Sequence, residues 1–177
     1  MKEFTRRLYL KNPKYEENSA TRRLKMEMMF PVGSGKPVGV FSQKRSHEVL
    51  SAAFDSETQY PDRVYLLGLG LVKSIREAYS LDEEGLQLSG LQIELDRLQK
   101  LHKNISNVNW RLKTYKDQNG SLLCLTNQAG ENGYINMGYE VIITRVLTRI
   151  EDDIYLRGGL PEKYAFKMST LFLSILL

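Results

Sequence analysis

The longest regular pattern of apolar and polar positions lies in residues 139–150, with the sequence YEVIITRVLTRI. Seven of these twelve residues are Val, Ile or Thr, whose stiff side chains fit the pleated surface of a sheet. With every second residue on one side, one face begins at Tyr139 and turns basic at Arg145 and Arg149, while the other stays apolar or neutral. The stretch therefore predicts a long strand with one buried and one partly exposed face.

Shorter alternating segments predict further strands. Residues 21–30 place Leu24, Met26, Met28 and Phe30 on one side, and a turn rich in Gly and Pro (31–37) leads to a short returning strand at 38–41. Residues 108–112 and 122–125 flank the sequence DQNG, and Asn-Gly between apolar runs is a strong hairpin signal because both residues tolerate positive φ.

Two segments predict helices. Ser46 can cap a helix that runs to about Phe54. Tyr60-Pro61-Asp62 starts a second helix, and its inward stripe consists of Val64, Leu67, Leu71, Ile75, Ala78 and Tyr79. Gly68 falls on this stripe and, with Gly70, would permit close packing, although a strand at 64–69 is an alternative. Residues 86–95 fit either a strand with a bulge at Gly90 or part of a helix that extends to about residue 103.

More strands than helices indicate an α+β fold. We expect a single domain over residues 21–177, with an antiparallel sheet of about five strands and two or three helices packed on one face. Residues 1–20 are polar and basic and are predicted to form a flexible arm. The length of 177 residues and the apolar content of 42% are sufficient for one core of ordinary size.

The net charge of +4 is concentrated at the N-terminal end of the chain. Residues 1–45 contain eleven Lys/Arg and four acids, a net charge of +7, which leaves −3 for the other 132 residues. Such a layout suits a polyanion or an anionic membrane, although a solvated surface arm is the plainer alternative. The candidate binding residues are Lys2, Arg6, Arg7, Lys11, Lys14, Arg22, Arg23, Lys25, Lys44 and Arg45.

The sequence contains no catalytic or metal-binding motif. The segment GSGK at 33–36 lacks the earlier Gly and the following Ser or Thr of a phosphate-binding loop, so a turn is expected there. Two histidines, His47 and His102, with the single Cys124 do not give a zinc site of usual spacing. Cys124 lies in an apolar run and is expected in the core. We therefore predict a non-enzymatic protein without a cofactor, metal or small-molecule substrate, and the lone cysteine favours a reducing compartment.

Aromatic residues beside cations offer a second way to bind nucleic acid. Trp110 with Arg111, and Tyr115 with Lys116, could stack on bases while pairing with phosphates. Trp110, however, is in phase with Val108 and Leu112 at a period of two, so it is predicted to lie in the core.

The C-terminal sequence LFLSILL is apolar to the last residue. It must be buried in the fold, against a second copy, or at a membrane surface. An intramolecular strand and a subunit contact are both compatible with it, and the self-association candidates are Leu171, Phe172, Leu173, Ile175, Leu176 and Leu177.

Several segments, taken in order, resemble the matrix protein of rhabdoviruses. Asn12-Pro13-Lys14-Tyr15-Glu16-Glu17 is similar to the proline–tyrosine budding motif of animal-virus members, although Asn12 stands where that motif needs its first proline. The departure argues against recruitment of WW domains, as expected of a plant-infecting member. RLKMEMMF resembles the first long strand of the family, SHEVLSAAF its Ser-led helix, and YEVIITRVLTRIEDD a late strand that ends in acids. The resemblance implies a structural protein that self-associates and links a nucleocapsid to an anionic membrane.

Two functional hypotheses follow. The first is a matrix-type protein of the virion and host cytoplasm, peripherally membrane-associated, with itself, ribonucleoprotein and an anionic membrane surface as partners. The second is an intracellular nucleic-acid-binding regulatory module that uses the basic N-terminal arm and the aromatic–cation pairs.

Overall fold

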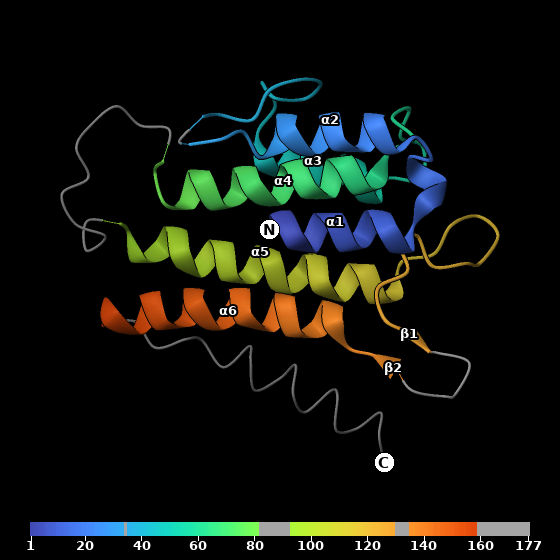
Figure 1. Ribbon diagram of the computed structural model, residues 1–177. Coiled ribbons are helices and arrows are strands. Elements are labelled where there is room, and N and C mark those ends of the chain that lie inside the picture. Colours follow the sequence, from blue (N-terminus) through green and yellow to red (C-terminus); the bar gives the residue numbers. More distant parts are fainter. Residues whose placement is uncertain (34, 82–92, 130–134, 159–177) are drawn as a thin grey trace, which may run out of the picture.

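Six α-helices make up most of the residues that the computed structural model describes, which are 1–33, 35–81, 93–129 and 135–158 (Figure 1). They are α1 (Lys2–Lys11), α2 (Ser19–Met29), α3 (Ser46–Phe54), α4 (Arg63–Ala78), α5 (Leu95–Thr114) and α6 (Gly138–Leu156). A 3-10 turn, η1 (Pro13–Tyr15), follows α1. The strands β1 (Gln128–Ala129) and β2 (Ile135–Asn136) have two residues each and form an antiparallel pair.

Helix α4 lies at the centre of the fold. It contacts α1, α2, α3 and α5, and α6 packs on α5 and α1 (Figure 1). Every residue from Val64 to Leu71 is buried, which is typical of a helix surrounded by protein on all sides. The core therefore forms around α4, and α6 closes it from the opposite side.

Two glycines allow neighbouring helices to approach α4 closely. A Cβ atom at Gly68 would lie 2.7 Å from Cγ2 of Thr5 in α1, and one at Gly70 would lie 2.6 Å from Cγ of Leu50 in α3. Real Cβ contacts are essentially never this short, so a side chain at either position would force the neighbouring groups to shift. The prediction that Gly68 and Gly70 permit close packing is confirmed.

The predicted α+β fold with a five-stranded antiparallel sheet is wrong, because the long predicted strand at 139–150 is the body of α6. Its apolar residues also repeat at intervals of three, four and seven. Tyr139, Ile143, Ile150 and Ile154 are therefore buried on one face of the helix, while Val141 is half-exposed. The apparent alternation came from β-branched residues that occupy both faces of the helix.

The other predicted strands fail for similar reasons. Residues 21–30 belong to α2, in which Met29 is buried and Leu24 is exposed. Residues 108–112 belong to α5, whose buried stripe has helical spacing: Leu98, Leu101, Ile105, Val108, Leu112. Neither 38–41 nor 122–125 forms a named strand. The DQNG turn exists, with Gly120 at φ +78°, but it follows a helix.

Both predicted helices are confirmed. Helix α3 starts at Ser46, which is its first residue and not the predicted cap, since the N-cap is Arg45. The Glu48 carboxylate accepts a hydrogen bond from the backbone N–H of Arg45 at 2.8 Å. Helix α4 starts after Asp62, which excludes the alternative strand at 64–69. Residues 95–103 lie in α5, as the helical alternative for that segment predicted, whereas 82–92 lie outside the described residues.

Residues 1–20, expected to be a flexible arm, instead form α1, η1 and the start of α2. Phe4, Leu8 and Tyr9 are buried in the core, and Phe4 contacts Tyr139 of α6 with 5.3 Å between ring centroids. The cations of α1 made the segment look like a solvated arm, but α1 is an amphipathic helix whose apolar residues are buried.

Candidate nucleic-acid interface

The ten predicted basic residues do not form one continuous free surface. Five of them pair with carboxylates: Arg6 and Arg7 with Glu3, Arg23 with Glu27, Lys25 with Glu16 and Asp62, and Lys44 with Glu48. The side chain of Arg22 donates to the backbone carbonyl of Glu17 at 3.4 Å. Lys2, Lys14 and Arg45 are exposed. Much of the N-terminal positive charge is thus balanced within the fold.

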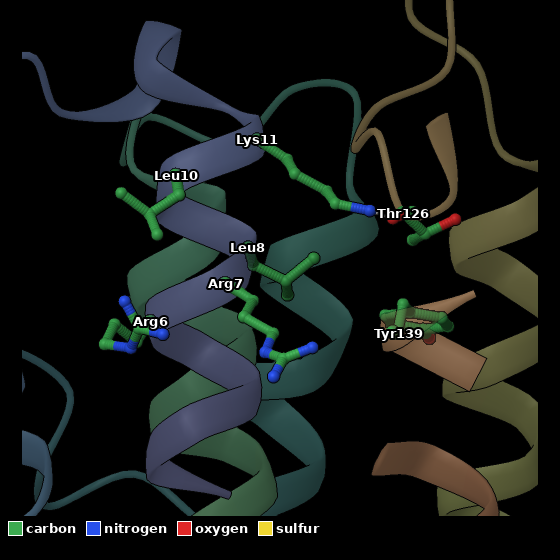
Figure 2. Close-up of a pocket in the computed structure, with 8 residues that line it drawn as sticks. Arg6, Arg7, Leu8, Leu10, Lys11, Thr126 and Tyr139 are labelled. Carbon is green, nitrogen blue, oxygen red and sulfur yellow. Dashed lines mark hydrogen bonds between the residues drawn. The ribbon is translucent and has the colours of Figure 1, made fainter. Parts of the chain in front are cut away.

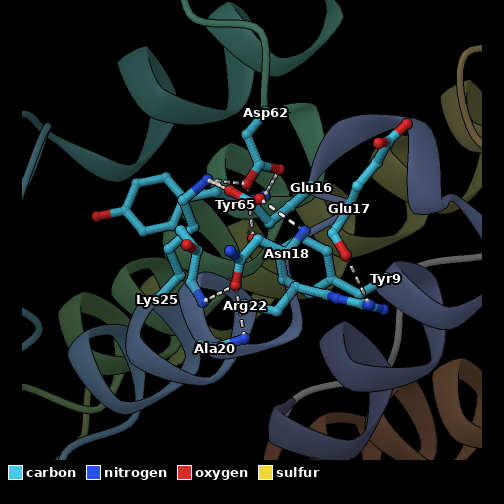
Figure 3. A network of polar contacts seen from close by, with 10 residues as sticks. Tyr9, Glu16, Glu17, Asn18, Ala20, Arg22, Lys25, Asp62 and Tyr65 are labelled. Carbon is cyan, nitrogen blue, oxygen red and sulfur yellow. Dashed lines mark hydrogen bonds and ion pairs between the residues drawn. The ribbon is translucent and has the colours of Figure 1, made fainter.

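Lys25 belongs to a buried polar network centred on Asp62 (Figure 3). One carboxylate oxygen of Asp62 caps α4 by accepting from the backbone N–H of Tyr65 at 2.8 Å. The other accepts from Lys25 Nζ at 2.7 Å and from the Tyr9 hydroxyl group at 2.8 Å. Burial alone would lower the pKa of Lys25, but its bonds to Asp62 and Glu16 outweigh that effect and raise the pKa. Lys25 therefore stabilises the fold and is not available for a ligand.

The segment that resembles a budding motif also makes internal contacts. Asn12 is 2% exposed, and its side chain accepts from the backbone N–H of Leu125 at 2.6 Å and donates to the carbonyl of the same residue at 2.9 Å. The Tyr15 hydroxyl group donates to the carbonyl oxygen of Leu123 at 2.5 Å. Both side chains hold the loop after α5 against η1.

An aromatic–cation cluster lies where α3 meets the end of α5. The guanidinium carbon of Arg111 is 5.5 Å from the ring centroid of Phe54 and 5.4 Å from that of Tyr115. The two rings meet edge to face, with 5.5 Å between centroids. Trp110 adds a third ring, 6.0 Å from Tyr115. These distances are typical of cation–π and aromatic pairs. We call Phe54, Trp110, Arg111 and Tyr115, with the two hollows beside Phe54, the Phe54 surface.

The prediction that Trp110 lies in the core is wrong, since 51% of its surface is exposed. In a helix, residues two apart point about 200° away from each other. Val108 and Leu112 face the core, so Trp110 between them must face outward. Its indole ring is open to a ligand.

Phe54 contributes to the lining of two hollows. The smaller, of about 140 Å³, is lined by polar side chains that include His47, Asn104 and Asn107. The larger, of about 400 Å³, is lined by Lys14, Arg63 and Lys116 and by one acid, Asp117. The Asp117 carboxylate takes part in the turn, because its Oδ1 accepts hydrogen bonds from the backbone N–H groups of Asn119 and Ser121. The larger hollow therefore presents a net positive charge.

Only Lys14 of the predicted basic residues reaches the Phe54 surface. The pairs Trp110–Arg111 and Tyr115–Lys116, noted as candidates for base stacking, do come together there. Phe54 and Arg63 were missed, because neither carries a local sequence signal that distinguishes it from a core or surface residue. The separation of Arg111 and Tyr115 by four positions was the signal in the sequence that they share a face.

Comparisons with known proteins do not identify the chain: no family model, no curated protein and no solved structure matches it. Among the residues that the structure describes, no helix is long and apolar enough to cross a membrane. No cluster of three or more His, Cys, Asp or Glu side chains suited to a metal ion is found in those same ranges.

The matrix-type hypothesis stays a prediction. Two of the stretches that resemble strands of that family, RLKMEMMF and YEVIITRVLTRIEDD, lie in α2 and α6 and their flanks. The predicted self-association residues of 171–177 lie outside the described residues. The structure therefore adds no observation in favour of that role.

Proposed function

We propose that the protein is a non-enzymatic module that binds single-stranded nucleic acid through the Phe54 surface. The observation that carries the proposal is the exposed ring of Trp110 next to Arg111 and Tyr115, beside a hollow with three cations. Proteins that bind single strands combine aromatic rings, on which bases stack, with a basic groove that follows the phosphates. The Phe54 surface has both parts.

A single strand fits this surface better than a duplex. The faces of bases are available for stacking on Trp110 only when the bases are unpaired. The smaller hollow adds the amide groups of Asn104 and Asn107 and the ring of His47. Amide and imidazole groups can both donate and accept hydrogen bonds, so they suit the edges of an unstacked base. The phosphates would then lie over Lys14, Arg63 and Lys116.

Fluorescence offers a direct test, because Trp110 is the only tryptophan in the chain. Titration of the protein with an unlabelled single-stranded oligouridine or oligothymidine should quench or shift the Trp110 emission to saturation. A duplex of the same length should bind more weakly at equal salt. An unchanged emission with both single strands up to millimolar phosphate concentration would refute the proposal.

Variants then locate the site by anisotropy of a labelled oligonucleotide. Trp110→Ala should weaken binding about tenfold, because a stacked base contributes about 1–3 kcal/mol. Lys116→Gln should weaken binding less and reduce the salt slope by about one. Tyr155→Ala is the matched control, since Tyr155 is a similarly exposed aromatic residue on α6, and it should bind as the wild type does. Equal losses in Trp110→Ala and Tyr155→Ala would contradict the assignment.

A further inference from the structure

We propose that a second site, independent of the Phe54 surface, binds a phosphate group between α1 and the start of α6. A cavity of about 260 Å³ lies there, lined by the cations Arg6, Arg7 and Lys11 and by Leu8, Thr126 and Tyr139 (Figure 2). Arg7 and Lys11 extend from the side of α1 that faces Tyr139, whereas Arg6 and Leu10 lie on the other side. The volume is several times the roughly 30 Å³ that one water occupies in the liquid, so a phosphate with its first waters fits.

The charge of the cavity selects an anion. Among the described residues that line it, three are cationic and none is acidic. Glu3, outside the lining, accepts hydrogen bonds from Nε of both Arg6 and Arg7. A guanidinium has donors on all three nitrogens. Within the described ranges, neither Nη group of Arg7 has a hydrogen-bond partner, so both can donate to an oxyanion.

The spacing of Arg7 and Lys11 points to a bridging ligand. Residues four apart on a helix are neighbours, and two like charges at that spacing destabilise it. Burial, followed by the charge of Arg7, lowers the pKa of Lys11. A phosphate between the two side chains would replace this repulsion with attraction to both. Lys11 already donates to the carbonyl of Thr126, which fixes its ammonium group at the mouth of the cavity.

The floor of the cavity strengthens such an interaction. Leu8 and Tyr139 are buried beneath it, and the Tyr139 hydroxyl group is directed to Asn109 at 3.1 Å. An apolar floor lowers the local dielectric, which increases the attraction between a bound anion and the cations. Guanidinium donors in a planar fork also match two oxygens of one phosphate.

The phosphate could belong to a soluble phosphomonoester or to a lipid headgroup. Leu10, at the rim, is 59% exposed, and Met137 at the start of α6 is half-exposed. Apolar side chains beside a headgroup site would suit contact with a membrane surface. The chemistry recognised is the same in both cases, so the experiment needs one arm for each source.

In the first arm, ¹⁵N-labelled protein is titrated with inorganic phosphate, and chloride is exchanged for it so that the ionic strength stays constant. The chemical shifts of the backbone amides are measured at each step. Saturable shifts are expected around Arg7, Lys11 and Thr126. Arg7→Gln and Lys11→Gln should each raise the Kd at least about tenfold, because each removes a charge-assisted hydrogen bond. Gln can still donate to the Thr126 carbonyl, so Lys11→Gln should fold. Lys100→Gln is the matched control, because it removes an exposed cation of α5 outside the linings given for the cavity and the two hollows, and it should leave the Kd unchanged.

The second arm is flotation with phosphatidylcholine vesicles with and without phosphatidic acid. Vesicle binding that needs phosphatidic acid and is lost in Arg7→Gln would support the site and show that it accepts the phosphate of a lipid headgroup. Saturable phosphate binding without any vesicle binding would support the site and indicate that its ligand is a soluble phosphomonoester. The proposal is overturned if the wild-type amides shift without saturation, or if Arg7→Gln and Lys11→Gln bind phosphate as tightly as the wild type.

Discussion

The hydroxyl group of Tyr9 in α1 donates a hydrogen bond of 2.8 Å to the carboxylate of Asp62, which caps α4. Tyr9 is 2% exposed and Asp62 is 1% exposed, so water has little access to the bond. Lys25 of α2 donates to the same carboxylate oxygen as Tyr9. The first two helices, α1 and α2, thus meet the distant α4 at one buried carboxylate, which ties the N-terminal segment to the centre of the core.

Tyr9→Phe tests the strength of this connection. The substitution removes one hydrogen bond to a charged acceptor but leaves the ring packing intact and the Lys25 contact in place. We expect a loss of about 1–2 kcal/mol in the free energy of unfolding, measured by urea denaturation. Tyr155→Phe, with Tyr155 more than half exposed, is the control and should change stability by less than about 0.5 kcal/mol. Equal stabilities for Tyr9→Phe and wild type would show that the bond contributes nothing net.

The sequence predicted those helices whose boundaries carry local signals. Helix α4 has Pro61 and Asp62 before its first turn and a single apolar stripe, so its start and inner face were recognisable. The second half of α5 and the whole of α6 were predicted as strands, because short windows such as 108–112 fit a period of two as well as a period of four. What decides between the periods is burial against another helix, which depends on residues distant in sequence.

The candidate sites were predictable only in part. The local pairs Trp110–Arg111 and Tyr115–Lys116 were visible as aromatic–cation neighbours, but the contribution of Phe54 depends on how α3 packs on α5. The charge distribution along the chain singled out Arg7 and Lys11 as candidate binding cations, but in a predicted flexible arm and not in the helix α1. It did not reveal that Lys25 would be neutralised by Glu16 and Asp62, since that pairing follows from the tertiary fold.

Gly70→Ala tests the close contact between α3 and α4. Alanine would favour the helix by up to about 1 kcal/mol, but its Cβ would lie 2.6 Å from Leu50 Cγ and 3.2 Å from the Leu50 backbone nitrogen. Overpacking typically costs about 1–3 kcal/mol, so we expect a net decrease in the free energy of unfolding.

A double-mutant cycle separates the two contributions. A Leu50→Ala background removes the two shortest contacts, to Cγ and Cδ2, and leaves the 3.2 Å approach to the backbone nitrogen, so Gly70→Ala should cost clearly less there than in the wild type. Thr148→Ala, at an exposed position of α6, reports helix propensity alone and should be slightly stabilising. The packing argument fails if Gly70→Ala stabilises the protein with Leu50 present.

Glu3 provides a prediction about pH. Hydrogen bonds from Arg6 and then Arg7 lower the pKa of its carboxyl group from 4.5 to about 2. A depressed pKa means that the folded state prefers the charged form. The stabilisation is therefore complete above about pH 4.5, declines as the pH falls below that value, and is lost by about pH 2. A carboxyl titration followed by NMR should give a midpoint near 2 for Glu3, and Arg6→Gln with Arg7→Gln should move it towards 4.5.

Stability measurements give an independent check of the same linkage. The difference in free energy of unfolding between wild type and Glu3→Gln should be largest above pH 4.5 and should shrink steadily towards pH 2, because protonated Glu3 resembles Gln in charge. Glu27→Gln is the matched control, since within the described ranges Glu27 makes a single exposed pair, with Arg23. A difference for Glu3→Gln that stays constant from pH 5 to about pH 2 would show that the two arginines do not hold the carboxylate in the folded state.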